Sequence, residues 1–497
     1  MKTNRFALLL NVLVVCGVLF MSACGTSTPT PTTVAPATAA PATAAPATAA
    51  PTVATASVPT VLNMPEQIAG GRPVTITVVG RPPDSQPTLL AAWAAQAARF
   101  TKKYPNVTIQ GSDYTYTPDS FAALVAGKQV PTLFQVYLTD PGKMIDQGVA
   151  ADLTSFFQAQ KLDTIYNPQI LSIVSKDGKI YGIPMNAYAM GLAYNIPMLK
   201  AAGYDAPPTT WDQLATMAQK LTNRDAGVAG FSMITDGSAA TGWHMTTLAF
   251  TFGLKNTDIV QQTNGKYVAG FDNASTLAAL SFVKDLRWKY DVLPRENLAW
   301  DTNGQALATG KAAMVMMAGD QFTWIRQTYP DAPINDFGFA PLPAGPDGKS
   351  VSLVGGNIAM VSAAATPDQI EAAAYYRLWT QFDAGEIQAT YDAGKADPTT
   401  VVGAPELPLY TGDYQTQTAA LQKFYANLPV DNYALFMNGI VSGQVGVSPE
   451  PLIAGQEFYG AMGSVVSTLV ADQSKDPATE LTAAAKTFQT NVLDKLK

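Results

Sequence analysis

The sequence predicts an α/β fold that is divided into two or more lobes. The chain has 497 residues, which is too long for one compact core. Its hydrophobic fraction of 47% is ordinary for a folded protein. From about residue 70 onward, β-rich and helical segments alternate along the chain. This alternation is typical of a mostly parallel sheet with helices on both of its faces.

Residues 1–23 have the layout of a secretory signal. Two basic residues, Lys2 and Arg5, precede an apolar run over residues 6–20, which is too short for a membrane-spanning helix. The stretch Met21-Ser-Ala-Cys24 is similar to the bacterial lipobox. That resemblance implies cleavage before Cys24 and attachment of lipid to this residue, and several acyl chains hold a protein firmly on a membrane. An ordinary signal peptide with an incidental Cys is the alternative.

A linker is expected over residues 24–69. No charged residue occurs from Gly25 to Pro65, and Pro-Ala-Thr-Ala-Ala runs three times between Pro36 and Ala50. Such a composition cannot bury a core, and its prolines favour an extended chain. We therefore expect a lipidated Cys24, a spacer to residue 69 and a folded domain over residues 70–497.

The first part of that domain supplies three strands and the first candidate site residues. Strands are expected over 74–79, 107–110 and 131–137, and helices over 88–104, 121–126 and 143–147. In open sheets of this type, ligands bind beyond the carboxyl ends of the strands. The side chains expected at two such ends are Arg81, Asp84, Tyr137, Thr139 and Asp140.

The remaining elements follow from caps and apolar spacing. Thr210 and Gln213 form a capping-box pattern that opens a helix through residue 221. A long helix is expected over 275–290, a buried strand over 312–317 and a helix over 367–382 after Thr366. Residues 452–496 are expected to be largely helical.

Three groups of motifs in order resemble a known family. They are Asp177-Gly-Lys-Ile-Tyr-Gly-Ile-Pro184 with Leu192-Ala-Tyr-Asn195 and Pro208-Thr-Thr-Trp-Asp-Gln-Leu214, then Ala308-Thr-Gly-Lys-Ala-Ala-Met314, and finally Gly338-Phe-Ala-Pro-Leu-Pro-Ala-Gly-Pro346. With them, residues 72–490 resemble the extracellular solute-binding proteins of ABC importers, in the subgroup that takes sugars and oligosaccharides.

The resemblance implies a two-lobed, periplasmic-binding-protein-like fold of type II with a ligand cleft between the lobes. We expect lobe 1 to comprise about residues 70–187 and 344–395, and lobe 2 about 190–337 and 408–497. The chain would cross between the lobes near 186–190, 337–343 and 395–408. The resemblance also implies that the protein is a monomer that closes on its solute by hinge motion. The membrane subunits of an ABC permease then recognise the closed form.

A sugar presents apolar ring faces and a fringe of hydroxyls, so its cleft needs aromatic rings and hydrogen-bonding side chains. Helical patterns place Trp93, Trp288 and Trp379 in cores, and Trp211 occupies a structural position of the family. The remaining candidates for ligand contact are Tyr188, Trp243, Trp300, Gly356, Asn357 and Tyr459, together with either Trp324 or Asp320. We expect Trp243→Ala to weaken binding more than tenfold with a nearly unchanged melting temperature.

Composition narrows the function classes further. A net charge of −7 argues against a nucleic-acid partner, and a single His, His244, makes His-based metal sites and catalytic triads improbable. No cofactor is expected. Acidic candidates Asp84, Asp140 and Asp320 keep a polyamine or amino compound as the alternative to a sugar. A secreted carbohydrate-active enzyme stays a further alternative, since two spaced carboxylates suffice for glycoside hydrolysis. The sequence thus predicts a non-enzymatic, lipid-anchored sugar-binding protein at the cell surface or in the periplasm.

Overall fold

The computed structural model describes residues 58–397 and 399–496. The predicted signal peptide, Cys24 and the linker up to residue 57 lie outside the described residues. Within the described ranges, no helix is long and apolar enough to cross a membrane.

The folded domain begins earlier than the expected boundary at residue 70. Leu62, Ile68 and Ala69 are buried in a core, with Val61 and Met64 packed against it. The side chain of Gln160 also exchanges two hydrogen bonds with the backbone of Asn63. The expected linker end was therefore wrong, because the apolar residues that follow the Thr-Pro repeats bury themselves against the domain.

The first core forms around three parallel strands. β1 (Val74–Val79) pairs with β2 (Val107–Ser112) and with β3 (Leu133–Tyr137), and the three lie where strands were predicted. Around them lie α1 (Pro87–Lys103), α2 (Pro118–Ala126), α3 (Pro141–Asp146), α4 (Thr154–Gln160), α5 (Pro168–Ile173), the β4–β5 hairpin (Ser175–Lys176 and Lys179–Ile180), α13 (Pro367–Phe382) and α14 (Ala384–Ala396). α13 has the predicted ends, and Thr366 and Gln369 cap it reciprocally.

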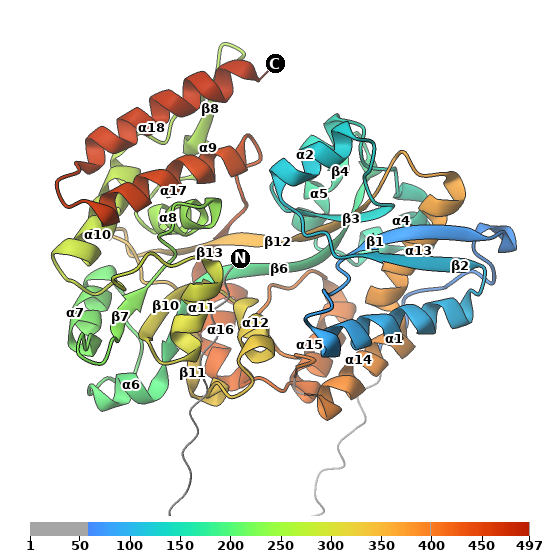
Figure 1. Ribbon diagram of the computed structural model, residues 1–497, viewed down its shortest axis with the longest axis horizontal. Helices are drawn as coiled ribbons and strands as arrows, with labels where there is room; N and C mark the ends of the chain where they lie inside the picture. Colours follow the sequence, from blue (N-terminus) through green and yellow to red (C-terminus); the bar gives the residue numbers. More distant parts are fainter. Residues whose placement is uncertain (1–57, 398, 497) are drawn as a thin grey trace, which may run out of the picture. The chain divides into compact units, whose positions relative to one another are not determined.

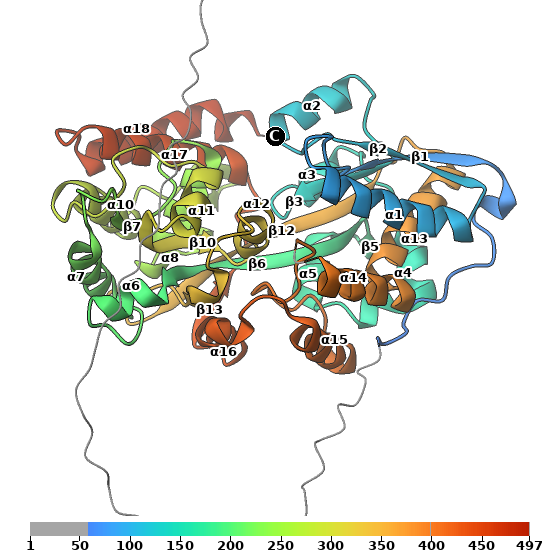
Figure 2. The same cartoon turned by 60° about the horizontal axis from the view of Figure 1, so that its bottom comes forward.

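Two long strands connect this core to a second one. β6 (Gly182–Asn195) and β12 (Ser350–Val361) extend from one half of the domain into the other in both views (Figure 1, Figure 2). They pair antiparallel with each other, and β12 continues the first sheet by pairing with β3. The nine-stranded sheet is therefore mixed, and the expectation of a mostly parallel sheet was wrong where the connecting strands run against their neighbours.

The second core lies on both faces of β10 (Ala312–Ala318), whose residues are all buried. β10 pairs with β6 and with β7 (Ala229–Ser232), while β11 (Phe337–Ala340) pairs with β6 and β13 (Val445–Ser448) with β12. The other elements here are α6 (Ile196–Ala201), α7 (Trp211–Leu221), α8 (Ala239–Thr251), α9 (Asn256–Ile259), the β8–β9 hairpin (Val260–Thr263 and Lys266–Ala269), α10 (Ala274–Trp288), α11 (Trp300–Ala308), α12 (Gln321–Thr328), α16 (Ala434–Val441), α17 (Gly455–Ala471) and α18 (Pro477–Asn491).

The places where the chain changes core are set by these strands. In β6, Ala187 belongs to the first core and Met190 to the second. In β12, the change falls between Leu353 and Val354. The crossing that we expected near 337–343 therefore lies later in the chain, because that segment forms β11 and stays beside β6.

The third connection is spread over a longer segment than expected. Val401 and Ala404 contact the second core, whereas Leu409 returns to the first. The chain then forms α15 (Gly412–Tyr425) beside α14. It returns to the second core at Leu428 and stays there.

Candidate functional site

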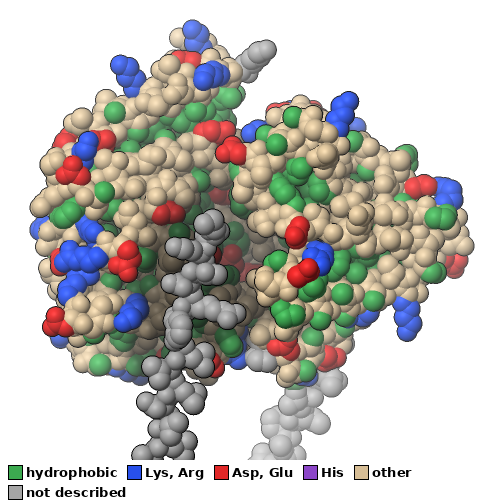
Figure 3. Space-filling model, in the orientation of Figure 1, with side chains coloured by type: hydrophobic (Ala, Val, Ile, Leu, Met, Phe, Trp, Pro, Cys, Tyr) green, Lys and Arg blue, Asp and Glu red, His purple; other side chains and the backbone are tan. Residues whose placement is uncertain are grey.

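A cavity of about 420 Å³ lies where β6 and β12 pass between the two cores. Figure 3 shows this face of the molecule hollowed between its two halves, with acidic side chains along both margins. The residues that line the cavity are Tyr137, Tyr188, Ala239, Ala240, Trp243, Trp300, Gly355, Gly356, Asn357, Glu450, Gln456 and Tyr459. They come from seven places in the chain, namely β3, β6, α8, α11, β12, α17 and the loop before α17.

The cavity brings together more than half of the residues that the sequence suggested. Tyr137, Tyr188, Trp243, Trp300, Gly356, Asn357 and Tyr459 all line it. The sequence reasoning missed Ala239, Ala240, Glu450 and Gln456. Trp243 lies in the second turn of α8.

Small residues allow the walls to come this close. A Cβ at Gly242 would lie 1.8 Å from the Tyr459 carbonyl oxygen, and one at Gly463 would lie 2.2 Å from that of Ser238. α8 and α17 therefore pack backbone to backbone, which sets Trp243 beside Tyr459. On β12, a Cβ at Gly355 would lie 2.6 Å from the Tyr188 ring and 2.9 Å from the Trp243 ring.

Three aromatic rings form one group in the wall. The ring centroids of Tyr188 and Trp243 are 6.3 Å apart at 84°, and those of Trp243 and Trp300 are 6.2 Å apart at 46°. Trp243 is only 7% exposed, and its indole Nε1 has no hydrogen-bond partner. The indole therefore combines an apolar face with a donor whose hydrogen bond is unmade.

Glu450 is the acidic residue of the cavity lining. It is 6% exposed, and the Tyr459 hydroxyl donates a hydrogen bond of 3.2 Å to its Oε1. Burial, reinforced by the charge of Asp140, raises the pKa of Glu450 to about 8, although the hydrogen bond from Tyr459 works in the opposite direction. A signal existed in the sequence, since Glu450 stands between Pro449 and Pro451, and prolines restrict the backbone that presents it.

The polar groups on the β3 side are already bonded within the protein. The Asn357 amide donates to Asn186 and its oxygen accepts from Gln135, while the Tyr137 hydroxyl donates to the Tyr116 carbonyl. At the rim, Gln456 Nε2 of α17 donates to Thr139 Oγ1 over 3.0 Å. Thr139 thus joins the two sides of the cavity without lining it.

The structure places five further predicted residues away from the cavity lining. Arg81 and Asp84 pair with each other at 2.6 Å on the first core. Asp140 accepts a hydrogen bond from Tyr116 and is buried. Trp324 packs against Gly304 and Tyr329. Asp320 begins α12, where burial and the neighbouring charge of Glu406 raise its pKa to about 7.

His244 has no room for a ligand role. It is fully buried, and its Nδ1 accepts a long hydrogen bond of 3.3 Å from the Ile234 amide. Burial lowers the pKa of His244 to about 3, so the ring is neutral at physiological pH. No group of three or more His, Cys, Asp or Glu suited to a metal ion occurs among the described residues.

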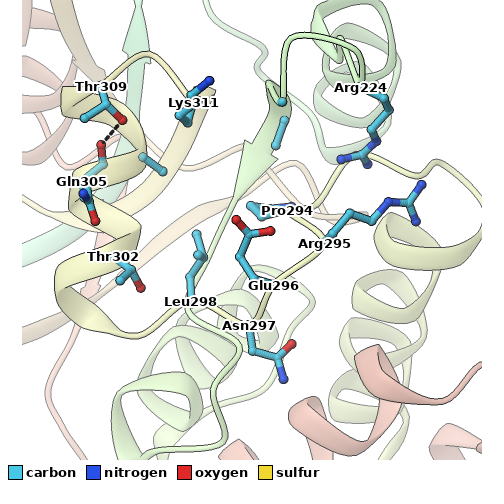
Figure 4. A pocket seen from close by; sticks show the side chains of 13 residues that line it. Arg224, Pro294, Arg295, Glu296, Asn297, Leu298, Thr302, Gln305, Thr309 and Lys311 are labelled. Atoms are coloured by element: carbon cyan, nitrogen blue, oxygen red, sulfur yellow. Dashed lines mark hydrogen bonds between the residues drawn. The ribbon is translucent and has the colours of Figure 1, made fainter. Parts of the chain in front are cut away.

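A second cavity of about 670 Å³ lies within the second core region, with its lining side chains shown in Figure 4. Its basic residues are already occupied by the protein. Arg224 donates to the side chain of Asp291 and the carbonyl of Leu293, Arg295 also pairs with Asp291, and Lys311 donates to the Ala226 carbonyl. It has no aromatic lining, so the first cavity is the better candidate for a solute.

The comparison with protein families decides the class of protein. The model of the bacterial extracellular solute-binding proteins matches residues 84–380. The chain belongs to this family. Its relatives include binding proteins of ABC transporters, so the predicted family is confirmed.

Similar proteins agree with this assignment. A binding protein of Brucella abortus is 27% identical over 213 residues, which are 41% of this chain and 47% of that protein. The maltooligosaccharide ABC transporter solute-binding lipoprotein of Streptococcus pneumoniae is 27% identical over 197 residues, 38% of this chain and 42% of that protein. The chain thus aligns with about half the length, or less, of these curated relatives.

The solved structures confirm the predicted fold. Maltose-bound MalE3 of T. maritima superposes with a TM-score of 0.66, covering 84% of this chain and 100% of that chain at 20% identity. This solute-binding protein accordingly has the two-lobed α/β fold of the periplasmic binding proteins, and the cavity lies between its lobes.

Proposed function

We propose that this solute-binding protein captures a sugar or an oligosaccharide in the cavity between its lobes and delivers it to the permease of an ABC importer. The observation that carries the proposal is the group formed by the Tyr188, Trp243 and Trp300 rings beside the buried, hydrogen-bonding Glu450. Aromatic faces cover the apolar faces of sugar rings, and a carboxylate accepts hydrogen bonds from their hydroxyls.

Two further points support a sugar as the solute. The pneumococcal relative is named for maltooligosaccharides, and the superposed MalE3 structure holds maltose. The cavity of about 420 Å³ also falls within the size range of small-molecule sites.

The lobes proposed for this motion are the two bodies on either side of β6 and β12. Because the two connecting strands are continuous and each changes core within a few residues, rotation about them would move the bodies as units. The solute must then bind the closed form more tightly than the open one.

A thermal-shift and calorimetric screen of the purified protein tests the proposal. A sugar that binds at saturating excess raises the melting temperature, because it binds only the folded state. Recovery of the sugar intact after prolonged incubation supports capture without catalysis. Disappearance of the sugar would instead favour the carbohydrate-active enzyme, and stabilisation by polyamines alone would replace the sugar with an amino compound.

We also propose that Cys24 carries the lipid that holds the protein at the outer surface of the cell membrane. The Cys24→Ser variant is expected to move from the membrane fraction to the soluble fraction when cells are fractionated, since the acyl chains supply the membrane affinity. Its solute affinity should be unchanged. Retention of the variant on membranes would mean that another part of the chain anchors it.

A further inference from the structure

Glu450 is held rigidly at the cavity wall. It lies between Pro449 and Pro451 in the loop that joins β13 to α17, and its backbone carbonyl accepts a hydrogen bond from Asn256. The same loop ends at Ala454, which has a left-handed backbone with φ of 51°. Such a conformation in a residue other than glycine is costly and persists where the surrounding structure fixes it.

No positive charge compensates this carboxylate. Among the described residues, none of the cavity-lining side chains is Lys or Arg, and none of the ion pairs involves Glu450. Three more acidic side chains act on the same region. Asp140 raises the pKa of Glu450, and both Asp320 and Glu406 act on Tyr188, whose pKa burial raises strongly.

An acidic wall of this kind favours a cationic ligand group for a simple reason. A buried carboxylate without a partner is costly when ionised, and a cation beside it recovers much of that cost in a medium of low dielectric constant. A neutral hydroxyl recovers less, because its hydrogen bond to a carboxylate lacks the second charge.

The aromatic group beside Glu450 also favours a cationic ligand group. Trp and Tyr faces attract cations through the ring quadrupole, and Trp does so most strongly. Tyr188, Trp243 and Trp300 converge next to Glu450 in the lining. The Trp243 Nε1 is buried and lies near the Glu450 carboxylate, whose pKa it lowers, so the polar edge of the indole faces Glu450.

Resting on the sugar-binding function proposed above, we propose that the solute is a sugar bearing a positively charged amino group, which sits between the Glu450 carboxylate and the rings of Trp243 and Tyr188. The apolar ring faces of the sugar would then cover the aromatic wall, and its hydroxyls would meet the polar side chains at the rim.

The proposal has a consequence in proton balance. In the empty cavity, the raised pKa of about 8 keeps Glu450 largely protonated at pH 7. The groups that face it are Tyr459 on α17, Trp243 on α8, Asp140 at the start of α3, and Tyr137 and Tyr188 on β3 and β6. Of these, only Asp140 is a second acid, and no base is present among them. A bound ammonium group favours ionised Glu450, so binding at pH 7 releases protons and the affinity rises with pH until the amine of the ligand loses its own proton.

The experiment compares pairs of sugars in which one member has ammonium groups at the positions where the other has hydroxyls, one in each sugar unit. Suitable pairs are glucosamine and glucose, galactosamine and galactose, and the β-1,4-linked dimers of glucosamine and of glucose. Calorimetry at pH 7 in buffers of different ionisation enthalpy gives both the affinity and the protons released. We expect the amino member of one pair to bind at least roughly tenfold more tightly, with proton release that its neutral partner does not show.

Glu450→Gln tests the role of the carboxylate. The amide keeps an oxygen that can accept from the Tyr459 hydroxyl, so the variant is expected to fold. It should lose roughly 30-fold in affinity for the amino sugar, change little for the neutral one, and abolish the proton release. Glu457→Gln on the exposed face of α17 makes the same charge change outside the cavity lining and should retain the preference.

The outcomes separate the two proposals. If neutral sugars bind as tightly as their amino partners, or if Glu450→Gln keeps the preference, the amino-sugar inference is wrong and the sugar-binding function stands. If no sugar binds while spermidine does, both the amino-sugar inference and the sugar-binding function are wrong.

Discussion

The two sides of the cavity differ in how far the protein already satisfies their polar groups. On the β3 side, the side chains of Tyr137 and Asn357 are hydrogen-bonded to neighbours in the protein. On the α8 and α17 side, the Trp243 Nε1 has no partner, and Glu450 has a hydroxyl donor but no counter-charge. A group whose bonds are complete holds its own position, whereas an incomplete one gains from a ligand. We therefore propose that the second lobe contributes more to ligand recognition and that the first lobe mainly holds its side chains in position.

The largest expected effect is that of Trp243→Ala. Removing the indole takes away the central ring of the aromatic group, so we expect the loss of affinity to exceed tenfold. The expectation that the melting temperature of this variant is nearly unchanged does not hold, because Trp243 is buried in the second core. The variant should also lose about 3–5 kcal/mol of stability, measured by urea unfolding alongside calorimetric titration.

Trp243→Phe is the matched control for that loss of stability. It fills more of the space but lacks the indole donor, so it should recover stability more than affinity. Full affinity in either variant would show that recognition does not depend on Trp243.

The next largest effect concerns the close packing of β12 against the Tyr188 and Trp243 rings. In Gly355→Ala, the new methyl group would lie 2.6 Å from the Tyr188 ring and 2.9 Å from the Trp243 ring, so both rings must move. We expect the affinity to fall roughly tenfold, as overpacking costs of order 1–3 kcal/mol. Gly460→Ala on α17, where a Cβ meets nothing within 4 Å, should bind like the unchanged protein. Equal affinities in the two variants would contradict a ring-positioning role for Gly355.

The sequence predicted the features that depend on local pattern better than those that depend on packing between distant segments. Strands, helices and caps depend on local pattern, which is why α13 and β10 were placed correctly. The rule on strand ends pointed to Tyr137, which lines the cavity, and to Arg81, which lies away from it. The strand order explains the difference, because β3 is the neighbour of β12 and the cavity, whereas β1 lies one strand further away.

Residues that long-range packing brings to the cavity were harder to find. Glu450 follows a short strand, more than 200 residues beyond Trp243 in the chain, and only the contact of α17 with α8 places the two together. The position of Trp324 also depended on packing, since Gly304 offers its ring a place on α11 outside the cavity. Neither position can be predicted from the spacing of apolar residues within one helix or strand.

A smaller effect compares two buried acids, Asp320 and Asp140, through the pH dependence of stability. The pKa of Asp320 is raised to about 7, mainly by burial, and its Oδ1 has no partner, whereas Asp140 accepts a hydrogen bond from Tyr116. A raised folded-state pKa stabilises the fold fully below the unfolded value near 4, and this contribution is lost as the pH rises toward 7.

The ligand-free protein is therefore expected to lose stability between about pH 4 and pH 7. Asp320→Asn should flatten that part of the profile by up to a few kcal/mol. Asp140→Asn should flatten it less, because the hydrogen bond from Tyr116 limits the rise in the pKa of Asp140. Melting temperatures across this range measure the difference. A steeper profile for Asp320→Asn than for the unchanged protein would contradict the assignment.

The smallest expected effect is that of Tyr137→Phe, and it tests the first-lobe side of the comparison directly. The Tyr137 hydroxyl donates to the Tyr116 carbonyl over 3.1 Å, so it is not free to serve a ligand unless that bond breaks. The variant keeps the ring that lines the cavity and should lose about 1 kcal/mol of stability or less. Its affinity should stay within about threefold of the unchanged protein, measured by the same calorimetric titration. A loss as large as that of Trp243→Ala would mean that the hydroxyl leaves Tyr116 for the solute, and that the first lobe takes part in recognition on equal terms with the second.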